Sequence, residues 1–214
     1  MTASSQEFIA RLRRVAVVPV VMIDDADAAV PLARALQAGG IDVIEVTLRT
    51  KAAVEAVRRI VTALPGMLVG AGTVLTAEHL RDSVAAGAGF LVSPGLTPAL
   101  AQLGLTAPVP LLPGIATASE AMAAAEHGFK FLKFFPAEAI GGVAALKAIG
   151  APLAHVQFCP TGGIDAAKAA AYLALPNVVC VGGSWLASPE AVRQGDWQRI
   201  TELSREASQG LRTA

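Results

Sequence analysis

Lys133 is the residue with the clearest potential for chemistry, because it lies within an apolar and aromatic run of the sequence. The run reads FLKFFPAEA from Phe131 to Ala139, and in a strand Lys133 shares one face with Phe131 and Phe135. Burying an ammonium ion among such side chains costs free energy unless it is paired or used. Apolar surroundings favour the neutral amine, which attacks a carbonyl carbon to form an imine. The alternative is a structural lysine held in an ion pair.

Glu45 and Arg49 form a second candidate group, in the run DVIEVTLRT (42–50). In a strand both side chains lie on the face opposite to the apolar Ile44 and Val46. An inward carboxylate can transfer protons, and an arginine can bind a carboxylate through two parallel hydrogen bonds. The alternative is a Glu45–Arg49 ion pair with a structural role alone. Together with a buried lysine, the two residues match imine chemistry on an α-keto acid.

Three other runs end in glycines and small hydroxyl side chains. The run GAGTV (70–74) presents Thr73 beside glycines that allow a ligand to approach closely, although Thr73 could equally be a turn residue. Two later runs each contain a glycine pair, which can bind phosphate through backbone N–H groups. One such pair is weak evidence, whereas two at the last two strands are stronger. The candidate phosphate residues are Gly162, Gly163, Gly182, Gly183 and Ser184.

Eight strand-like apolar runs alternate with alanine-rich helical stretches along the chain. The predicted strands are 15–22, 42–48, 68–74, 89–95, 110–115, 131–137, 156–163 and 178–186. This alternation indicates βα units joined by short loops. An open dinucleotide-binding sheet would carry a GxGxxG turn after its first strand, and the sequence has none there. We therefore predict one α/β domain over residues 1–214, a (β/α)8 (TIM) barrel with an N-terminal helix.

Local signals predict the ends of two helices. A helix over 28–38 should end at Gly39-Gly40, because glycine readily ends a helix. Thr76 should cap a helix over 77–86, because its hydroxyl can accept from the first turn.

The charge balance argues against nucleic acid or a membrane as a partner. Lys+Arg and Asp+Glu both number 17, so the formal net charge is zero. The stretch 83–119 has no charged residue, but five prolines interrupt it, so we expect no membrane-spanning helix. Three arginines before the first strand resemble the start of a signal peptide. Cleavage there would remove a strand that the fold needs, so we expect a cytoplasmic protein.

The remaining polar and sulfur-containing residues predict no cofactor. Cys159 and Cys180 lie in apolar runs without CxxC spacing and are interpreted as buried free thiols of a reducing compartment. The histidines lack metal-ligand spacing, so we expect neither a metal nor another cofactor. The other lysines are interpreted as surface residues: Lys51, Lys130, Lys147 and Lys168.

With these runs the chain resembles the 2-dehydro-3-deoxy-6-phosphogluconate (KDPG) aldolases, a family that includes 4-hydroxy-2-oxoglutarate (KHG) aldolases. The resemblance extends from about Val17 to the C-terminal helix, and its lysine and Glu/Arg motifs are highly specific. The matching runs are EVTLRT (45–50), GAGTV (70–74), SPGLT (93–97), FKFLKFFPAEA (129–139), FCPTGGI (158–164) and GGSWL (182–186).

The resemblance implies a metal-free class I aldolase, an aldehyde-lyase, that assembles as a homotrimer. Its substrate would be KDPG, cleaved to pyruvate and glyceraldehyde 3-phosphate in the Entner–Doudoroff pathway. Lys133 would form the imine, Glu45 would act as general acid and base, and Arg49 and Thr73 would hold the pyruvyl carboxylate. Thr161 would lie near the C4 hydroxyl. The other substrate contacts implied are Pro94, Phe135, Gly162, Gly163, Gly183 and Ser184.

One departure and three alternatives accompany this resemblance. Ile140 stands where the family pattern has Asn, which affects any polar contact from that loop but not the core chemistry. The main or second substrate could instead be KHG, cleaved to pyruvate and glyoxylate, although Ser184 and the glycine pairs favour phosphate. A phosphosugar isomerase or epimerase on the same barrel would use Lys133 electrostatically. A non-catalytic protein that binds phosphorylated metabolites is the third alternative.

Overall fold

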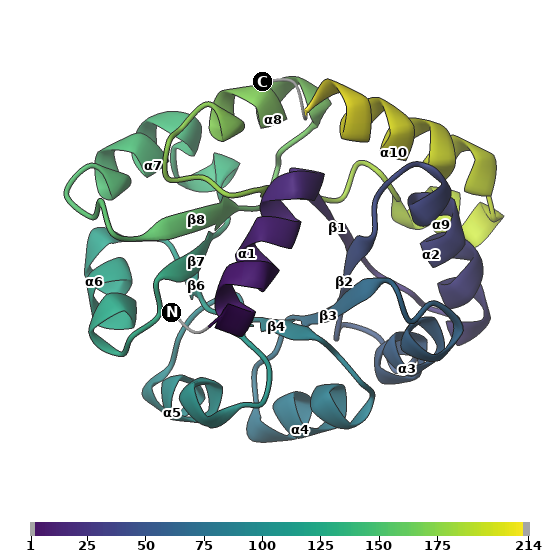
Figure 1. The fold of residues 1–214 in the computed structure, drawn as a ribbon, viewed down its shortest axis with the longest axis horizontal. Coiled ribbons are helices and arrows are strands. Elements are labelled where there is room, and N and C mark those ends of the chain that lie inside the picture. Colours follow the sequence, from purple (N-terminus) through teal and green to yellow (C-terminus); the bar gives the residue numbers. More distant parts are fainter. Residues whose placement is uncertain (1–2, 212–214) are drawn as a thin grey trace.

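The computed structural model describes residues 3–211 as parallel strands surrounded by helices (Figure 1). The strands are β1 (Val17–Val21), β2 (Val43–Thr47), β3 (Leu68–Gly72), β4 (Phe90–Val92), β5 (Leu111–Leu112), β6 (Gly114–Ile115), β7 (Phe131–Phe134), β8 (Gln157–Pro160) and β9 (Val181–Gly183). The helices are α1 (Ala3–Val15), α2 (Ala29–Ala38), α3 (Ala53–Ala63), α4 (Ala77–Ala85), α5 (Pro98–Thr106), α6 (Ala118–Glu126), α7 (Gly142–Gly150), α8 (Ala166–Leu173), α9 (Pro189–Gln194) and α10 (Trp197–Gly210). Two 3-10 turns, η1 (Ala26–Ala28) and η2 (Glu138–Ile140), complete the described elements.

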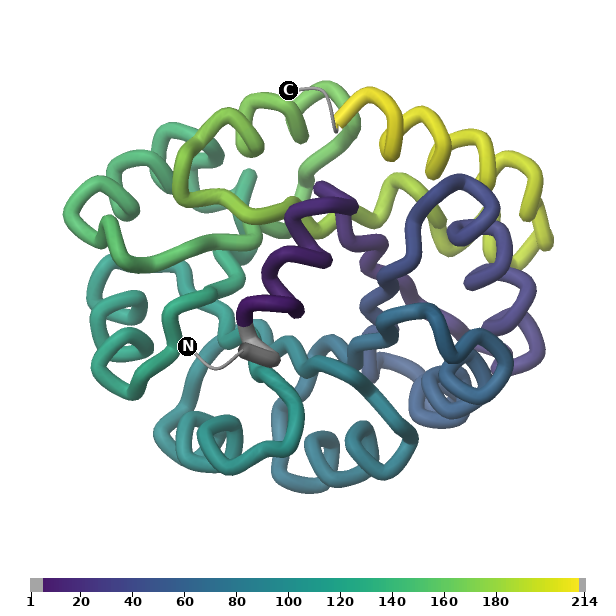
Figure 2. Tube along the Cα trace, viewed as in Figure 1, coloured from purple at the N-terminus to yellow at the C-terminus, as the bar shows by residue number. Residues whose placement is uncertain are grey.

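The strands form two parallel sheets. The larger curls through the order β5-β4-β3-β2-β1-β9, and the smaller has the order β6-β7-β8. Parallel bridges at Phe158–Val178 and Thr161–Gly182 connect β8 with the β9 region. The chain advances around this arrangement in one direction, so α10, in yellow, returns beside α2 (Figure 2).

Each of the eight predicted strand regions contains a strand, but the fifth is divided. The single strand predicted over 110–115 was wrong in its continuity, because Pro113 separates β5 from β6. Proline has no N–H to donate to a neighbouring strand. β5 therefore pairs with β4, whereas β6 pairs with β7, and the carbonyl of Pro113 accepts from the backbone N–H of Lys133 at 2.9 Å.

Alternate residues of each strand face two different apolar cores. Val43 and Phe131 belong to the interior cluster, together with the aromatic ring of Phe90. Ile44 and Leu132 are also buried, but they belong to the cluster formed with the surrounding helices. This arrangement confirms the alternation predicted for β2 and β7, because successive side chains of a strand point to opposite faces.

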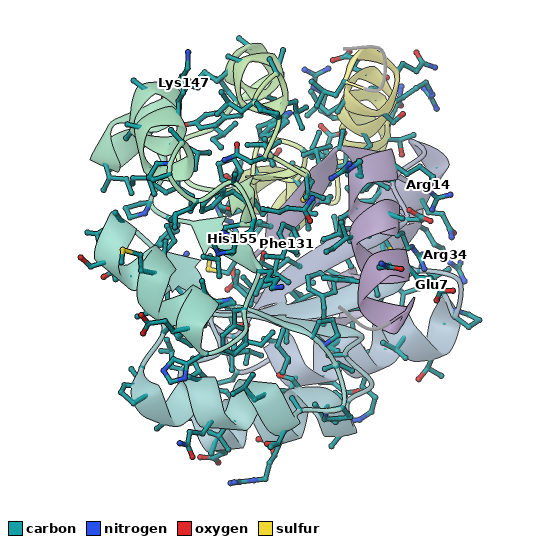
Figure 3. All side chains as sticks on the ribbon, turned by 60° about the vertical axis from the view of Figure 1, so that its left-hand side comes forward. Glu7, Arg14, Arg34, Phe131, Lys147 and His155 are labelled. Atoms are coloured by element: carbon teal, nitrogen blue, oxygen red, sulfur yellow. The ribbon has the colours of Figure 1, made fainter. Side chains whose placement is uncertain are left out.

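Helix α1 lies across one end of the strand arrangement (Figure 1). Phe8 packs against Phe90 and Phe131, with ring centroids 5.4 and 6.3 Å apart. These partners are the first residues of β4 and β7, so α1 covers the amino ends of the strands. In Figure 3 Glu7 and Arg14 extend outward from α1, while Phe131 lies inside. Arg14 pairs with an aspartate that precedes β2.

The two helix ends predicted from local signals are confirmed to within one residue. Thr76 accepts a hydrogen bond from the backbone N–H of His79, and α4 begins at Ala77, directly after Thr76. α2 ends at Gly39, where a Cβ would lie 2.3 Å from the Cβ of Ser204 in α10. Ser208 donates to the Gly39 carbonyl at 2.8 Å. Gly39 thus caps α2, and its lack of a side chain lets α10 pack closely against it.

The charge-free stretch folds into short elements, as expected from its prolines. Within residues 3–211, no helix has the length and apolar character needed to cross a membrane.

We predict that Phe8→Ala lowers the free energy of unfolding by about 3 kcal/mol, because it removes a buried ring from the interior cluster. Glu7→Ala is the matched control, since Glu7 is an exposed neighbour on the same helix, and it should change stability by less than about 0.5 kcal/mol. Urea denaturation measures both. Equal effects of the two substitutions would contradict the proposed packing of α1.

Candidate active site

Lys133 lies inside the fold, on β7, with 6% of its surface exposed. Its Nζ is 3.3 Å from Oε1 of Glu45, and it lies 5.3 Å from the centroid of the Phe135 ring. The inward orientation predicted for Lys133 is therefore confirmed. An ion pair is also present, as the structural alternative required. The surroundings of the pair distinguish a nucleophilic lysine from a purely structural one.

Glu45 is brought to Lys133 by β2 and by the absence of side chains on β3. Glu45 is 4% exposed and lies in register with Gly70 of β3. A Cβ at Gly72 would lie 2.2 Å from Oε1 of Glu45, so only glycine leaves room for the carboxylate in this position. The sequence interpretation treated Gly72 as a flank of Thr73 and missed this role. The role of Gly72 follows from the register of β2 with β3, and the sequence of one strand alone does not reveal that register.

Two threonines lie at the carboxyl ends of neighbouring strands, Thr47 at the end of β2 and Thr73 directly after β3. Thr47 is buried and donates to the carbonyl of Val21 at 2.9 Å, which fixes β2 against β1. Thr73 follows β3 and has a φ of 60°, a conformation that β-branched residues rarely adopt. Such backbone strain often accompanies functional sites.

A cavity of about 390 Å³ opens near the carboxyl ends of β1, β2, β7, β8 and β9. It brings together seven of the predicted site residues: Arg49, Phe135, Thr161, Gly162, Gly163, Gly182 and Ser184. Phe135 joins this cavity to Lys133, because its ring lies beside the ammonium group. Lys133, Glu45, Thr73, Pro94 and Gly183 are outside the residues that line the cavity. The cavity is thus the mouth of a site whose lysine–carboxylate pair lies deeper.

Arg49 is exposed at this mouth. The described residues pair Glu45 with Lys133 and show no ion pair between Glu45 and Arg49. A guanidinium group beside an open cavity can accept a carboxylate from a ligand.

The two glycine pairs have different structural roles. Gly162 and Gly163 have φ values of 107° and 76°, which favour glycine and form a turn at the cavity. A Cβ at Gly182 would lie 2.3 Å from Oγ1 of Thr161, and one at Gly183 would collide with the Trp185 ring. The second pair therefore permits close packing, and the exposed Ser184 follows it.

Pro94 lies in the turn after β4. A Cβ at Gly114 would lie 2.2 Å from the Pro94 carbonyl oxygen, so this turn packs directly on β6. Ile140, in η2, is partly buried and packs against the helix-facing core. This environment accounts for an apolar side chain at that position.

Lys168 is more than the ordinary surface residue that the sequence indicated. Its Nζ donates to the Gly163 carbonyl at 3.1 Å and lies 3.0 Å from Oε2 of Glu138. Tyr172 donates to the other oxygen of Glu138 at 2.6 Å. The hydrogen bond from Tyr172, followed by that from Lys168, lowers the pKa of the Glu138 carboxyl below its ordinary value. Sequence interpretation missed Glu138 and Tyr172, because no local pattern connects them.

Cys159 and Cys180 are free and buried in the interior, as predicted. A hydrogen bond with Cys159, together with burial, raises the pKa of the Cys180 thiol. Within residues 3–211, no three His, Cys, Asp or Glu side chains gather as potential metal ligands.

A parallel α/β fold with a buried lysine–carboxylate pair below an open cavity is typical of enzymes that form imines with carbonyl substrates. The chain belongs to the KDPG and KHG aldolase family, whose sequence model matches residues 8–203. It is 52% identical over 196 residues to the KHG/KDPG aldolase of Escherichia coli, which covers 92% of each chain.

Solved structures give the same relationship. The KDPG aldolase of Legionella pneumophila, with pyruvate captured as a covalent carbinolamine intermediate, has a TM-score of 0.90 and 47% identity, covering 93% of this chain and 97% of its own. The 2-keto-3-deoxy-6-phosphogluconate aldolase of Zymomonas mobilis with 3-phosphoglycerate has a TM-score of 0.88 and 46% identity, covering 94% of each chain.

We predict that Gly72→Ala lowers the free energy of unfolding by about 1–3 kcal/mol, because the added methyl group would overlap the Glu45 carboxylate. Gly66→Ala is a suitable control, since a Cβ at Gly66 would meet nothing within 4 Å. Thermal and urea denaturation of both variants provide the comparison. A Gly72→Ala protein as stable as the control would show that the carboxylate does not need this space.

Proposed function

We propose that this chain is a class I aldolase, an aldehyde-lyase that cleaves KDPG to pyruvate and glyceraldehyde 3-phosphate. The observation that carries the proposal is the buried contact of 3.3 Å between Lys133 and Glu45, next to a cavity with Arg49 at its mouth. The relatives named KDPG aldolase support the substrate, and the carbinolamine captured in the Legionella enzyme supports covalent chemistry with pyruvate.

The proposed reaction begins with proton transfer from Nζ of Lys133 to Glu45, which leaves a neutral amine. The amine attacks the C2 keto carbon, and Glu45 returns a proton to the departing hydroxyl, so that a protonated imine forms with loss of water. Removal of the C4 hydroxyl proton then breaks the C3–C4 bond, and its electrons enter the imine to give an enamine. Protonation of C3 and hydrolysis release pyruvate. Glu45, through water, serves these proton transfers in sequence.

The other site residues are proposed to bind the substrate. Arg49 and Thr73 hold the pyruvyl carboxylate, and Thr161 lies near the C4 hydroxyl. The remaining proposed contacts are Pro94 and Phe135 around the pyruvyl group, and Gly162, Gly163, Gly183 and Ser184 at the phosphate. The positive φ values of the first glycine pair support phosphate binding, because they turn successive N–H groups toward one side.

The same proposal includes the architecture and setting of the protein. Residues 1–214 would form one domain, a closed (β/α)8 barrel. The bridges between β8 and the β9 region support closure, and so does the position of β5 and β6, which follow each other in the chain and pair with β4 and β7 respectively. We propose a homotrimer, by family resemblance, and a cytoplasmic location, which the free cysteines support. Its partners would be the phosphorylated keto acid and pyruvate, without nucleic acid, membrane, metal or other cofactor.

Borohydride reduction in the presence of pyruvate should attach one pyruvyl group to Lys133, because hydride reduces an imine to a stable amine. Peptide mass mapping locates the adduct. Lys133→Ala should form no adduct and lose turnover in an assay that couples pyruvate release to lactate dehydrogenase. Lys130→Ala is the control, since Lys130 is exposed just before β7, and its adduct should remain at Lys133. Full activity of Lys133→Ala would refute the mechanism.

The trapping experiment also separates the other functional classes. A phosphosugar isomerase or epimerase that uses Lys133 electrostatically would give no adduct. A protein that merely binds phosphorylated metabolites would bind the ligand without releasing pyruvate.

The second candidate function is cleavage of KHG to pyruvate and glyoxylate, which the name of the 52% identical E. coli relative favours. We expect kcat/KM to be higher for KDPG than for KHG, because Ser184 and the glycine turn line the cavity where a phosphate would bind. Steady-state kinetics with both substrates tests this order. A higher kcat/KM for KHG would make that substrate the main one.

A further inference from the structure

Three side chains from separate parts of the chain meet behind the turn at Gly162 and Gly163. Glu138 follows β7, and Lys168 and Tyr172 lie one helical turn apart on α8. Tyr172 is fully buried and donates to one oxygen of Glu138, and Lys168 pairs with the other. None of the steps of the proposed reaction uses these residues, so their arrangement requires another explanation.

The backbone of the turn is held from the same side. The carbonyl groups of residues 161–163 all accept hydrogen bonds from this region of the fold. The first two accept from the backbone N–H groups of Ala137 and Glu138, at 2.8 and 3.1 Å. The third accepts from Nζ of Lys168 at 3.1 Å. Three consecutive peptide groups are therefore fixed in orientation.

Fixing these carbonyl groups also fixes the N–H groups of residues 162–164. In a trans peptide the N–H points opposite to the C=O, so these N–H groups face away from η2 and Lys168. Residues 162–164 line the cavity. A cation on the Gly163 carbonyl also polarises that peptide group and makes the following N–H a stronger donor. Such a row of N–H groups binds anions.

Glu138 keeps Lys168 in this position. Its side chain packs on the turn, because a Cβ at Gly163 would lie 2.8 Å from the Cβ of Glu138. The hydrogen bond that Lys168 donates to Glu138 raises the pKa of Lys168, so the lysine stays protonated. Burial, followed by the hydrogen bond to Glu138, raises the pKa of Tyr172, which therefore stays a donor.

We propose that Lys168, held by Glu138 and Tyr172, is a positioning residue that aims the backbone N–H groups of residues 162–164 at the substrate phosphate. The residue thereby sets the preference for a phosphorylated keto acid over its unphosphorylated counterpart. This inference rests on the proposed aldolase function and assigns the phosphate selectivity of that site to a network behind it.

The test is the steady-state kinetics of Lys168→Met with the phosphorylated keto acid and with its dephosphorylated counterpart. KM for the phosphorylated substrate should rise about tenfold, because the N–H groups of residues 162–164 would no longer be held toward the phosphate. KM for the dephosphorylated substrate and kcat for both should stay within about twofold of the wild type. Inorganic phosphate, as a competitive inhibitor, should lose affinity by the same factor as the phosphorylated substrate. Lys168→Arg should restore most of the preference, because arginine keeps a cationic donor.

Two further variants and one control define the network. Glu138→Gln and Tyr172→Phe should each shift selectivity in the same direction as Lys168→Met. Lys147→Met removes an exposed lysine from α7 and should shift nothing. An unchanged selectivity ratio in Lys168→Met would overturn the inference. An equal rise of KM for both substrates would also overturn it.

Pyruvate trapping separates this inference from the function on which it rests. A wild-type protein that forms no adduct at Lys133 contradicts the proposed function itself. If Lys168→Met traps pyruvate as fast as the wild type and keeps the wild-type selectivity ratio, only the positioning role is wrong.

Discussion

The fold depends on accommodating one ion pair, that of Lys133 and Glu45, in an otherwise apolar interior. Both groups lose most of their contact with water, so each needs the other. The strands bring them together across the interior from opposite sheets, and Gly72 provides the space that the carboxylate occupies. Removal of either charge would leave the other buried without a partner. The glycine at position 72 and the register of β2 with β3 are therefore requirements of this ion pair.

The residues around this pair divide into an apolar layer and a polar mouth. Phe131 and Cys159 lie beside Lys133 in the interior cluster, where they exclude water from its stem. Arg49 and Thr161 lie at the cavity, where a ligand can reach them. On β8 the change from apolar to polar takes two residues: Cys159 belongs to the interior cluster, and Thr161, just after the end of the strand, lines the cavity. Under the proposed mechanism, the substrate would form its covalent bond in the apolar interior and bind its charged groups at the solvent-accessible cavity.

Much of this arrangement could be predicted from the sequence, because strand alternation is a local property. Alternation predicted that Lys133 and Glu45 point into the interior and that Ile44 points toward the surrounding helices, and the structure agrees. The division of the fifth strand could not be read in this way, since it depends on which neighbours flank Pro113. The role of Gly72 depends on register, and the Glu138–Lys168–Tyr172 network joins residues about 30 positions apart. Such contacts are fixed by tertiary packing and leave no periodic signal.

Helix α1 affects where substrate, water and products can enter and leave the site. Its Phe8 ring fills the interior at the amino ends of β4 and β7, whereas the cavity opens at the carboxyl ends of the strands. The cavity that contains Arg49 and Ser184 therefore lies at the end of the interior opposite to Phe8. Under the proposed mechanism, the aldehyde fragment leaves through this cavity, and water enters through it to hydrolyse the remaining imine. In that mechanism the aldehyde leaves first, because pyruvate stays covalently attached to Lys133 until water hydrolyses the imine.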